Sequence, residues 1–225
     1  RIIAISEKAA ELLAQHIGRN DISVIENGID VQRYAQATPI DRHEIVPDHH
    51  DGDITITMVA AFRPQKDQDS ATRALTHLPD NYKLCLVGDG ERRNIIEALI
   101  AQLGMQQRVM LLGIRTDVPQ ILSASDVVVL ASHWEGFGLA AVEGMATKKP
   151  LIATNVDGLA QVISGAGVLF ADGDHHQLAT AIAELMSHPD YYQKVATACA
   201  KAALRYDIAT TATRYSNLYH HTNPR

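Results

Sequence analysis

The chain has 225 residues, of which 46% are hydrophobic and 20% are charged, so it has ample apolar material for a buried core. Its formal net charge of −6 and pI near 6.0 argue against a nucleic-acid partner, which normally requires a basic face. No apolar stretch approaches the roughly 20 residues of a membrane span, and Cys85 and Cys199 lie in apolar and alanine-rich runs that predict buried free thiols. These features indicate a globular protein of the reducing cytoplasm.

The first predicted elements are a strand over residues 1–5 and a helix over residues 6–18. Ser6 is placed to cap the start of this helix, and Gly18 is placed to end it. Because the strand is already under way at Arg1, we expect the chain to be a piece of a longer protein.

A second short strand is predicted over residues 23–26, and it ends in an Asn27-Gly28 turn. The polar residues 36–52, which include prolines, predict a loop or linker. Asp48-His49-His50-Asp51 lies in this segment, but its residues lack helical or zinc-type spacing, so we assign no metal site to them.

From residue 53 onward, strand and helix patterns alternate regularly. Strands are predicted over residues 54–60, 83–87, 109–112, 127–130, 151–153 and 168–170. Helices are predicted over residues 67–77, 91–103, 116–124, 138–147, 158–164 and 175–187, followed by two more over 189–204 and 208–221. This alternation is typical of right-handed βαβ units. The predicted fold class is therefore α/β, with a Rossmann-like, doubly wound parallel sheet.

The loops that follow the predicted strands all emerge at one edge of the sheet, where ligands bind in open α/β folds. Several of them contain glycine, which lets backbone approach a ligand closely, although strand-to-helix turns also use glycine without any ligand. The loop over residues 60–67 carries the cations Arg63 and Lys66. A cation near a helix start is unfavourable unless an anion intervenes, so we predict that Lys66 contacts a phosphate.

The segment from Glu135 to Glu143 carries the strongest functional signal. Gly136 and Gly138 precede a helix whose free first-turn N–H groups suit a diphosphate. Glu143 lies in this helix among apolar neighbours, where an unpaired carboxylate is costly, so we expect a donor partner such as the two hydroxyls of a ribose. Glu135 is either a ligand contact or a charge favoured by the helix N-terminus. His133 and Trp134 are candidates to shape the pocket, although for Trp134 we expect a packing role instead.

Glu135-Gly136-Phe137-Gly138 together with Glu143 resembles the E-x7-E motif of the retaining, nucleotide-sugar-dependent glycosyltransferases of GT-B fold, the glycosyl transferases group 1 family. Further segments match in order: Asn27-Gly28-Ile29-Asp30, Pro64-Gln65-Lys66-Asp67, Val87-Gly88-Asp89-Gly90, Leu112-Gly113, Ala124-Ser125-Asp126, Asp157-Gly158 and Tyr215-Ser216-Asn217-Leu218-Tyr219. The resemblance covers nearly the whole chain, but only the C-terminal, donor-binding half of such an enzyme.

The resemblance also implies a division of the chain. Residues 1–21 would be an interdomain strand and helix, and residues 22–204 the nucleotide-sugar-binding, Rossmann-like domain. Residues 205–225 would form a helix that crosses back towards the N-terminal half.

The same resemblance implies roles for individual residues. Lys66 and Glu135 would be catalytic, because Lys66 would neutralise the diphosphate leaving group and Glu135 would bind hydroxyls of the transferred sugar. Glu143 would hold the donor ribose. Further donor contacts would come from Arg63, Gly136, Phe137, Gly138, Leu139, Asp89, Gly90 and Ile114. Family members usually carry an arginine five residues before the lysine, where this chain has Ala61.

The implied reaction is transfer of a sugar, with retention of configuration, in bacterial surface polysaccharide or lipopolysaccharide synthesis. The co-substrate would be a nucleotide-diphosphate sugar, with no cofactor and no metal. A saccharide or lipid-linked acceptor would bind through the other half of the enzyme. The implied location is cytoplasmic, with room for peripheral association at the inner membrane. We expect this chain alone to bind donor but to transfer the sugar poorly or not at all.

Two other classes are open. A nicotinamide-dependent oxidoreductase would need G-x-G-x-x-G after an early strand, but Gly88-Asp89-Gly90 is followed by Arg93 where the third glycine belongs. A non-catalytic nucleotide-sugar-binding module would use the same donor residues as the transferase.

Overall fold

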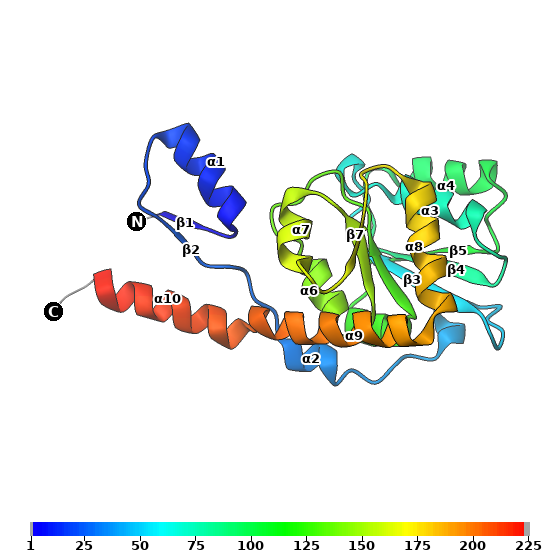
Figure 1. The fold of residues 1–225 in the computed structure, drawn as a ribbon. Helices are drawn as coiled ribbons and strands as arrows, with labels where there is room; N and C mark the ends of the chain where they lie inside the picture. Colours follow the sequence, from blue (N-terminus) through cyan, green and yellow to red (C-terminus); the bar gives the residue numbers. More distant parts are fainter. Residues whose placement is uncertain (1, 223–225) are drawn as a thin grey trace.

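The structure is a computed structural model, and it describes residues 2–222 (Figure 1). Its largest part is a six-stranded parallel sheet with the strand order β5-β4-β3-β6-β7-β8. The strands are β3 Ile54–Val59, β4 Tyr82–Val87, β5 Val109–Gly113, β6 Val127–Leu130, β7 Leu151–Thr154 and β8 Val168–Phe170. The chain winds outward from β3 to β5 and then returns to β6 on the other side of β3. This confirms the predicted doubly wound sheet and places the loops after β3 and β6 next to each other.

Helices cover both faces of this sheet. They are α2 Val31–Ala35, α3 Gln68–Ala74, α4 Arg93–Gln102, α5 Val118–Ala124, α6 Leu139–Ala146, α7 Asp157–Ile163, α8 His175–Ser187 and α9 Pro189–Ala203, with the 3₁₀ turns η2 Pro64–Lys66 and η3 Leu75–His77. Alternate residues of β4 belong to different core clusters: Leu84 and Leu86 lie in the larger one, and Cys85 and Val87 in the smaller one. Because successive side chains of a strand point to opposite faces, both faces are buried.

The beginning of the described chain forms a small unit of its own. Strand β1 Ile2–Ala4 and strand β2 Ile22–Val24 pair in parallel, and helix α1 Glu7–Ile17 connects them. As predicted, Ser6 caps α1 by accepting a hydrogen bond from the Ala9 amide at 3.1 Å, and Gly18 ends it with a φ of 65°. The predicted boundary between residues 21 and 22 falls immediately before β2, so it separates two strands that pair with each other.

The small unit joins the large sheet at a crossing of two chain segments. The Ile29 amide donates to the carbonyl of Tyr206 at 2.9 Å, and the Ile208 amide donates to the carbonyl of Ile29 at 2.8 Å. Helix α10 Ile208–Thr222 starts at this crossing and runs beside the small unit (Figure 1). Gly28 is required here, because a Cβ would lie 2.5 Å from Thr211 Oγ1. The three-segment division of the chain stays a prediction, and its residues 223–225 lie outside the described residues.

The predicted loop over residues 36–52 is wrong in one respect, since part of it is core. It contains the 3₁₀ turn η1 Arg42–Glu44, and Ile45 and Val46 are fully buried at 0% exposure. Arg42 anchors the segment by pairing with Asp126 at 2.6 Å. Sequence polarity around these apolar residues obscured their burial.

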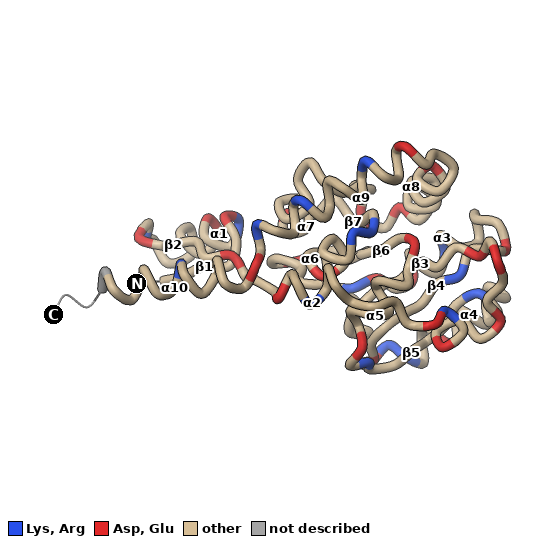
Figure 2. Tube along the Cα trace, turned by 90° about the horizontal axis from the view of Figure 1, so that it is seen from below, with Lys and Arg blue, Asp and Glu red and all other residues tan. Residues whose placement is uncertain are grey.

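Other general expectations can be compared with the structure. Cys85 and Cys199 are free and buried, as predicted. No helix within residues 2–222 is long and apolar enough to cross a bilayer. Figure 2 shows Lys and Arg interspersed with Asp and Glu along the fold. Many of these opposite charges are paired, as Arg92 is with Asp69 at 2.8 Å.

Candidate functional site

A cavity of about 430 Å³ opens where the loops after β3 and β6 meet the start of α6. We call it the α6 cavity. Its volume falls within the range of about 300–1,000 Å³ that is usual for small-molecule sites. Seven of the predicted site residues line it: Lys66, Glu135, Gly136, Phe137, Gly138, Leu139 and Glu143. The sequence motif and the loop after β3 therefore converge on one space.

Lys66 and Glu135 form an ion pair inside this cavity. Lys66 ends η2, Glu135 lies in the loop after β6, and the ammonium donates to Glu135 Oε2. Their side chains are only 21% and 16% exposed. The Ser132 hydroxyl donates to the same oxygen at 3.4 Å. A cation just before a helix is unfavourable without an anion beside it. Lys66 has such an anion, and in this structure it is the carboxylate of Glu135.

Backbone contacts hold the Glu135 loop against the β3 loop and α7. The His133 amide donates to the carbonyl of Gln65 at 2.8 Å, and the Gln65 side chain donates to the carbonyl of Trp134 at 2.8 Å. Gly158, in the first turn of α7, lies so close that a Cβ would be 1.9 Å from the carbonyl oxygen of Glu135. These contacts fix where the Glu135 carboxylate stands.

The N-terminus of α6 faces the same cavity. Gly138 takes a left-handed conformation with a φ of 83° and caps α6 without any side-chain hydrogen bond. The first-turn N–H groups therefore have no side-chain cap, as an anion site requires. Leu139 is 41% exposed, whereas the ring of Phe137 is buried edge-on against Tyr206 at 5.3 Å. The ring of Phe137 therefore packs in the core.

Glu143 lies on α6 with its carboxylate half-buried, and it has the donor partner that its apolar surroundings predict. The partner is the hydroxyl of Tyr34, on α2. Burial raises the pKa of Glu143, while the hydrogen bond from Tyr34 and the charge of Arg33 oppose this. Burial, followed by the charge of Glu143, raises the pKa of Tyr34 well above its usual range.

Sequence reasoning missed Tyr34, although a signal was present. Asp30, the last residue of the matched Asn27-Gly28-Ile29-Asp30 segment, caps α2 by accepting from the Arg33 amide at 3.0 Å. Reading Asp30 as a helix cap would have predicted α2 and placed an aromatic hydroxyl one turn along it.

A second network, also missed in part, flanks the Glu135 loop. His133 Nδ1 lies 2.6 Å from a carboxylate oxygen of Asp172, and its Nε2 lies 3.7 Å from Asp67 Oδ2. The hydrogen bond to Asp172 raises the pKa of His133, desolvation opposes it, and the charges of Asp67, Asp172 and Asp69 add to the increase. The His133 side chain therefore ties the loop before Glu135 to the segment after β8.

Another cavity, of about 510 Å³, lies between α1 and the Glu135 loop. Glu135 and Gly136 line both cavities, so Glu135 stands at their junction. Trp134 lines this second cavity and is 64% exposed. The expected packing role of Trp134 is therefore wrong.

Four predicted donor residues do not line the α6 cavity: Arg63, Asp89, Gly90 and Ile114. Ile114 is 83% exposed. Asp89 accepts a hydrogen bond from the Gly90 amide at 2.8 Å. Their proposed donor contacts stay predictions.

The glycines after β4 have a use that the sequence did not reveal. A Cβ on Gly88 would lie 2.1 Å from the carbonyl oxygen of Ala60, and a Cβ on Gly90 would lie 2.6 Å from that of Phe62. These glycines let the β4 loop pack against the β3 loop. The close approach is therefore to the protein's own backbone.

Comparisons with known proteins agree with this arrangement. The family model described as Glycosyl transferases group 1 matches residues 40–203. The UDP-Gal:alpha-D-GlcNAc-diphosphoundecaprenol alpha-1,3-galactosyltransferase of Escherichia coli is 33% identical over 167 residues, which cover 70% of this chain and 43% of that protein. The D-inositol 3-phosphate glycosyltransferase of Rhodococcus opacus is 29% identical over an alignment of 236 positions, which covers 94% of this chain and 51% of that protein.

The crystal structure of Anabaena Alr3699/HepE in complex with UDP-glucose is similar with a TM-score of 0.87 and 26% identity, over 97% of this chain and 63% of that one. The parallel sheet thus matches GT-B glycosyltransferase structures. The chain spans about half the length of the curated relatives it matches. Because the family model covers most of the chain, including both sides of the α6 cavity, the chain belongs to the glycosyl transferases group 1 family.

Proposed function

We propose that this chain is the donor-binding part of a retaining glycosyltransferase that transfers a hexose-type sugar from a nucleotide-diphosphate sugar to a saccharide or lipid-linked acceptor. The observation that carries the proposal is the α6 cavity, where an ammonium, an uncapped helix N-terminus and a half-buried carboxylate face one space. These three groups match the diphosphate and the ribose of such a donor.

The diphosphate would lie between Lys66 and the start of α6. Backbone N–H groups at Gly138 and Leu139 and the positive end of the helix macrodipole favour an anion there. Lys66 adds a full positive charge, which stabilises the leaving diphosphate as the glycosidic bond breaks. The ion pair with Glu135 keeps this ammonium in the cavity before the donor arrives.

The ribose would bind to Glu143. A carboxylate has two oxygens with about four lone-pair positions, and Tyr34 uses one of them. The positions left over can accept hydrogen bonds from both ribose hydroxyls. Partial burial strengthens such bonds, because water competes with them less.

The transferred sugar would lie next to Glu135, at the junction of the two cavities. Its hydroxyls would donate to the Glu135 carboxylate when Lys66 turns to the diphosphate. We further propose retention of the anomeric configuration, with the donor's own phosphate accepting the proton of the incoming acceptor, and no cofactor or metal. The reaction would serve bacterial surface polysaccharide or lipopolysaccharide synthesis on the cytoplasmic side, with peripheral contact to the inner membrane.

Calorimetric titration with UDP-, GDP- and ADP-sugars tests the donor site directly. One of these donors should bind, and Glu143→Gln should weaken it by about ten-fold or more, since a hydrogen bond to a charged group contributes about 1.5–3 kcal/mol. Glu97→Gln, on the exposed face of α4, is the matched control and should bind normally. No binding to any donor, or undiminished binding by Glu143→Gln, would contradict the proposal.

Transfer itself has to be measured in the longer protein. A proton NMR coupling constant at the new anomeric centre should show the configuration of the donor sugar. The inverted configuration would exclude retention, and donor binding without any transfer would favour the non-catalytic module.

A further inference from the structure

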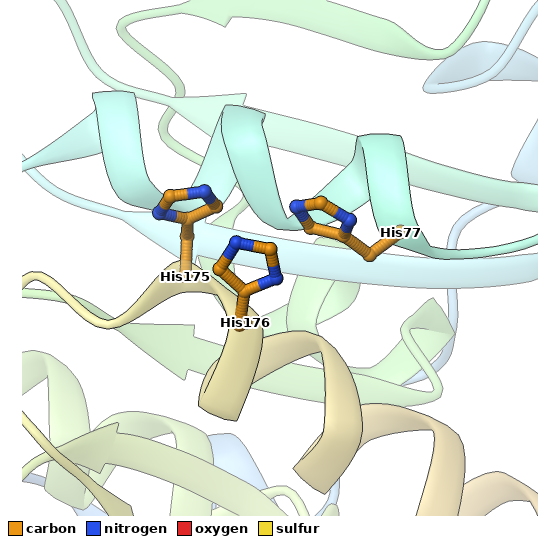
Figure 3. Close-up of side chains that lie close together, drawn as sticks. All are labelled: His77, His175 and His176. Atoms are coloured by element: carbon orange, nitrogen blue, oxygen red, sulfur yellow. The ribbon is translucent and has the colours of Figure 1, made fainter.

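Three histidines from two separate elements converge on the surface formed by η3 and α8. His77 ends η3, and His175 and His176 are the first two residues of α8 (Figure 3). One ring nitrogen of each lies within 4.8 Å of the corresponding nitrogens of the others. The ring centroid of His77 is 4.0 Å from that of His176 and 5.4 Å from that of His175. None of the three lines the α6 cavity.

The ring nitrogens of this cluster are available. Within residues 2–222, no hydrogen bond or ion pair engages a ring nitrogen of His77, His175 or His176; the only side-chain bond to these residues is from Thr180 to the backbone carbonyl of His176. The cluster of His133 with Asp67 and Asp172 differs, because there the histidine is hydrogen-bonded to a carboxylate.

We propose that His77, His175 and His176 form a binding site for a late divalent transition-metal ion such as Zn²⁺ or Ni²⁺. Imidazole nitrogen is a preferred ligand of these ions, whereas Mg²⁺ and Ca²⁺ prefer oxygen. Zinc–nitrogen bonds of about 2.0–2.1 Å in a tetrahedral site place the nitrogens about 3.3 Å apart. The ring nitrogens therefore have to come closer by at most about 1.5 Å to reach this geometry.

The bound ion would link two elements that are distant in sequence. His77 follows α3, the helix that begins next to Lys66, and His175 and His176 begin α8, which packs against α3. Three protein ligands leave the remaining coordination position to water. Because the folded chain brings the ligands together and the unfolded chain does not, the ion should stabilise the fold.

Calorimetry with ZnCl₂ or NiCl₂, on protein without a polyhistidine tag, tests the proposal without using any nucleotide. The chain should bind one equivalent of the ion, and the melting temperature should rise in its presence and fall back with EDTA. His77→Gln and His176→Gln should each weaken binding by about ten-fold or more. Both side chains are exposed, so circular dichroism of the two variants should match that of the parent protein.

The control is the double variant His49→Gln/His50→Gln, which removes another pair of adjacent histidines and should bind the ion normally. Absence of binding, or equal binding by the parent and both His77→Gln and His176→Gln, would overturn the proposal. So would loss of the bound equivalent in the control. UDP-sugar affinity should be the same in His77→Gln as in the parent protein, so failure of the metal site and failure of the donor site are distinguishable.

Discussion

Replacement of Lys66 by alanine should weaken the binding of UDP much more than the binding of uridine. In the proposed complex the ammonium contacts the diphosphate, which uridine lacks. A hydrogen bond to a charged group contributes about 1.5–3 kcal/mol, equivalent to about 10- to 150-fold in Kd. Two features of the cavity act in opposite directions within this range. Lys66 gives up Glu135 when it turns to the ligand, which lowers the net gain, whereas the alanine variant leaves Glu135 to repel the diphosphate.

The assay is calorimetry of both ligands against Lys66→Ala, with Lys201→Ala on the exposed face of α9 as the control. We expect a loss of about 30-fold for UDP, near the middle of the range, and a loss under about two-fold for uridine. The double variant Lys66→Ala/Glu135→Gln should regain part of the UDP affinity, because the repelling carboxylate is gone. Equal losses for UDP and uridine, or an unchanged Kd for UDP, would refute the assignment of Lys66 to the diphosphate.

Three further changes test the surroundings of the cavity. Because the pKa of Glu143 is raised in the folded state, the stability that its protonation contributes is complete below about pH 4.5 and is lost as the pH rises through the folded-state pKa. The free energy of unfolding, measured by urea titration, should therefore decrease with rising pH above 4.5 in the parent protein relative to Glu143→Gln. Tyr34→Phe removes the hydroxyl that donates a hydrogen bond to Glu143 and should lower the free energy of unfolding at pH 7 by about 1–3 kcal/mol. No change would mean that water satisfies Glu143 as well as the Tyr34 hydroxyl does. Gly158→Ala should cost about 3 kcal/mol and lower the melting temperature, because its Cβ would meet the carbonyl oxygen of Glu135, while Gly136→Ala, with only Ile5 at 3.7 Å, should be nearly neutral.

The sheet could be predicted from sequence because its strands are short apolar runs separated by helical patterns. β6 and β7 are buried at every position, as such runs are in a parallel sheet that helices cover on both faces. The segment before β3 could not be predicted in the same way. Ile45 and Val46 are two apolar residues among polar ones, and their burial depends on the distant side chains of β4 and α5.

The candidate site was predictable where function depends on position along the chain. Glu135, Glu143 and the glycines between them are placed by one loop and one helix, so their spacing fixes their geometry. Tyr34 reaches Glu143 from a helix about one hundred residues earlier, and only the packing of α2 on α6 brings them together. The role of Gly88 was ambiguous for a related reason. A glycine after a strand indicates a close approach of backbone, but the sequence does not say whether a ligand or another loop, here that of Ala60, is approached.

The crossing at Ile29 limits how the small N-terminal unit can move. The segment that connects that unit to the large sheet and the segment that leads from the sheet into α10 meet at this point, and two backbone hydrogen bonds fasten them to each other. A displacement that separated these two segments would break both bonds, so the end of the small unit and the start of α10 are tied together at Ile29. On the far side of the unit, Lys8 of α1 pairs with Asp157 of α7 at 3.6 Å, and both residues line the second cavity. The width of that cavity therefore depends on where these two contacts hold the small unit.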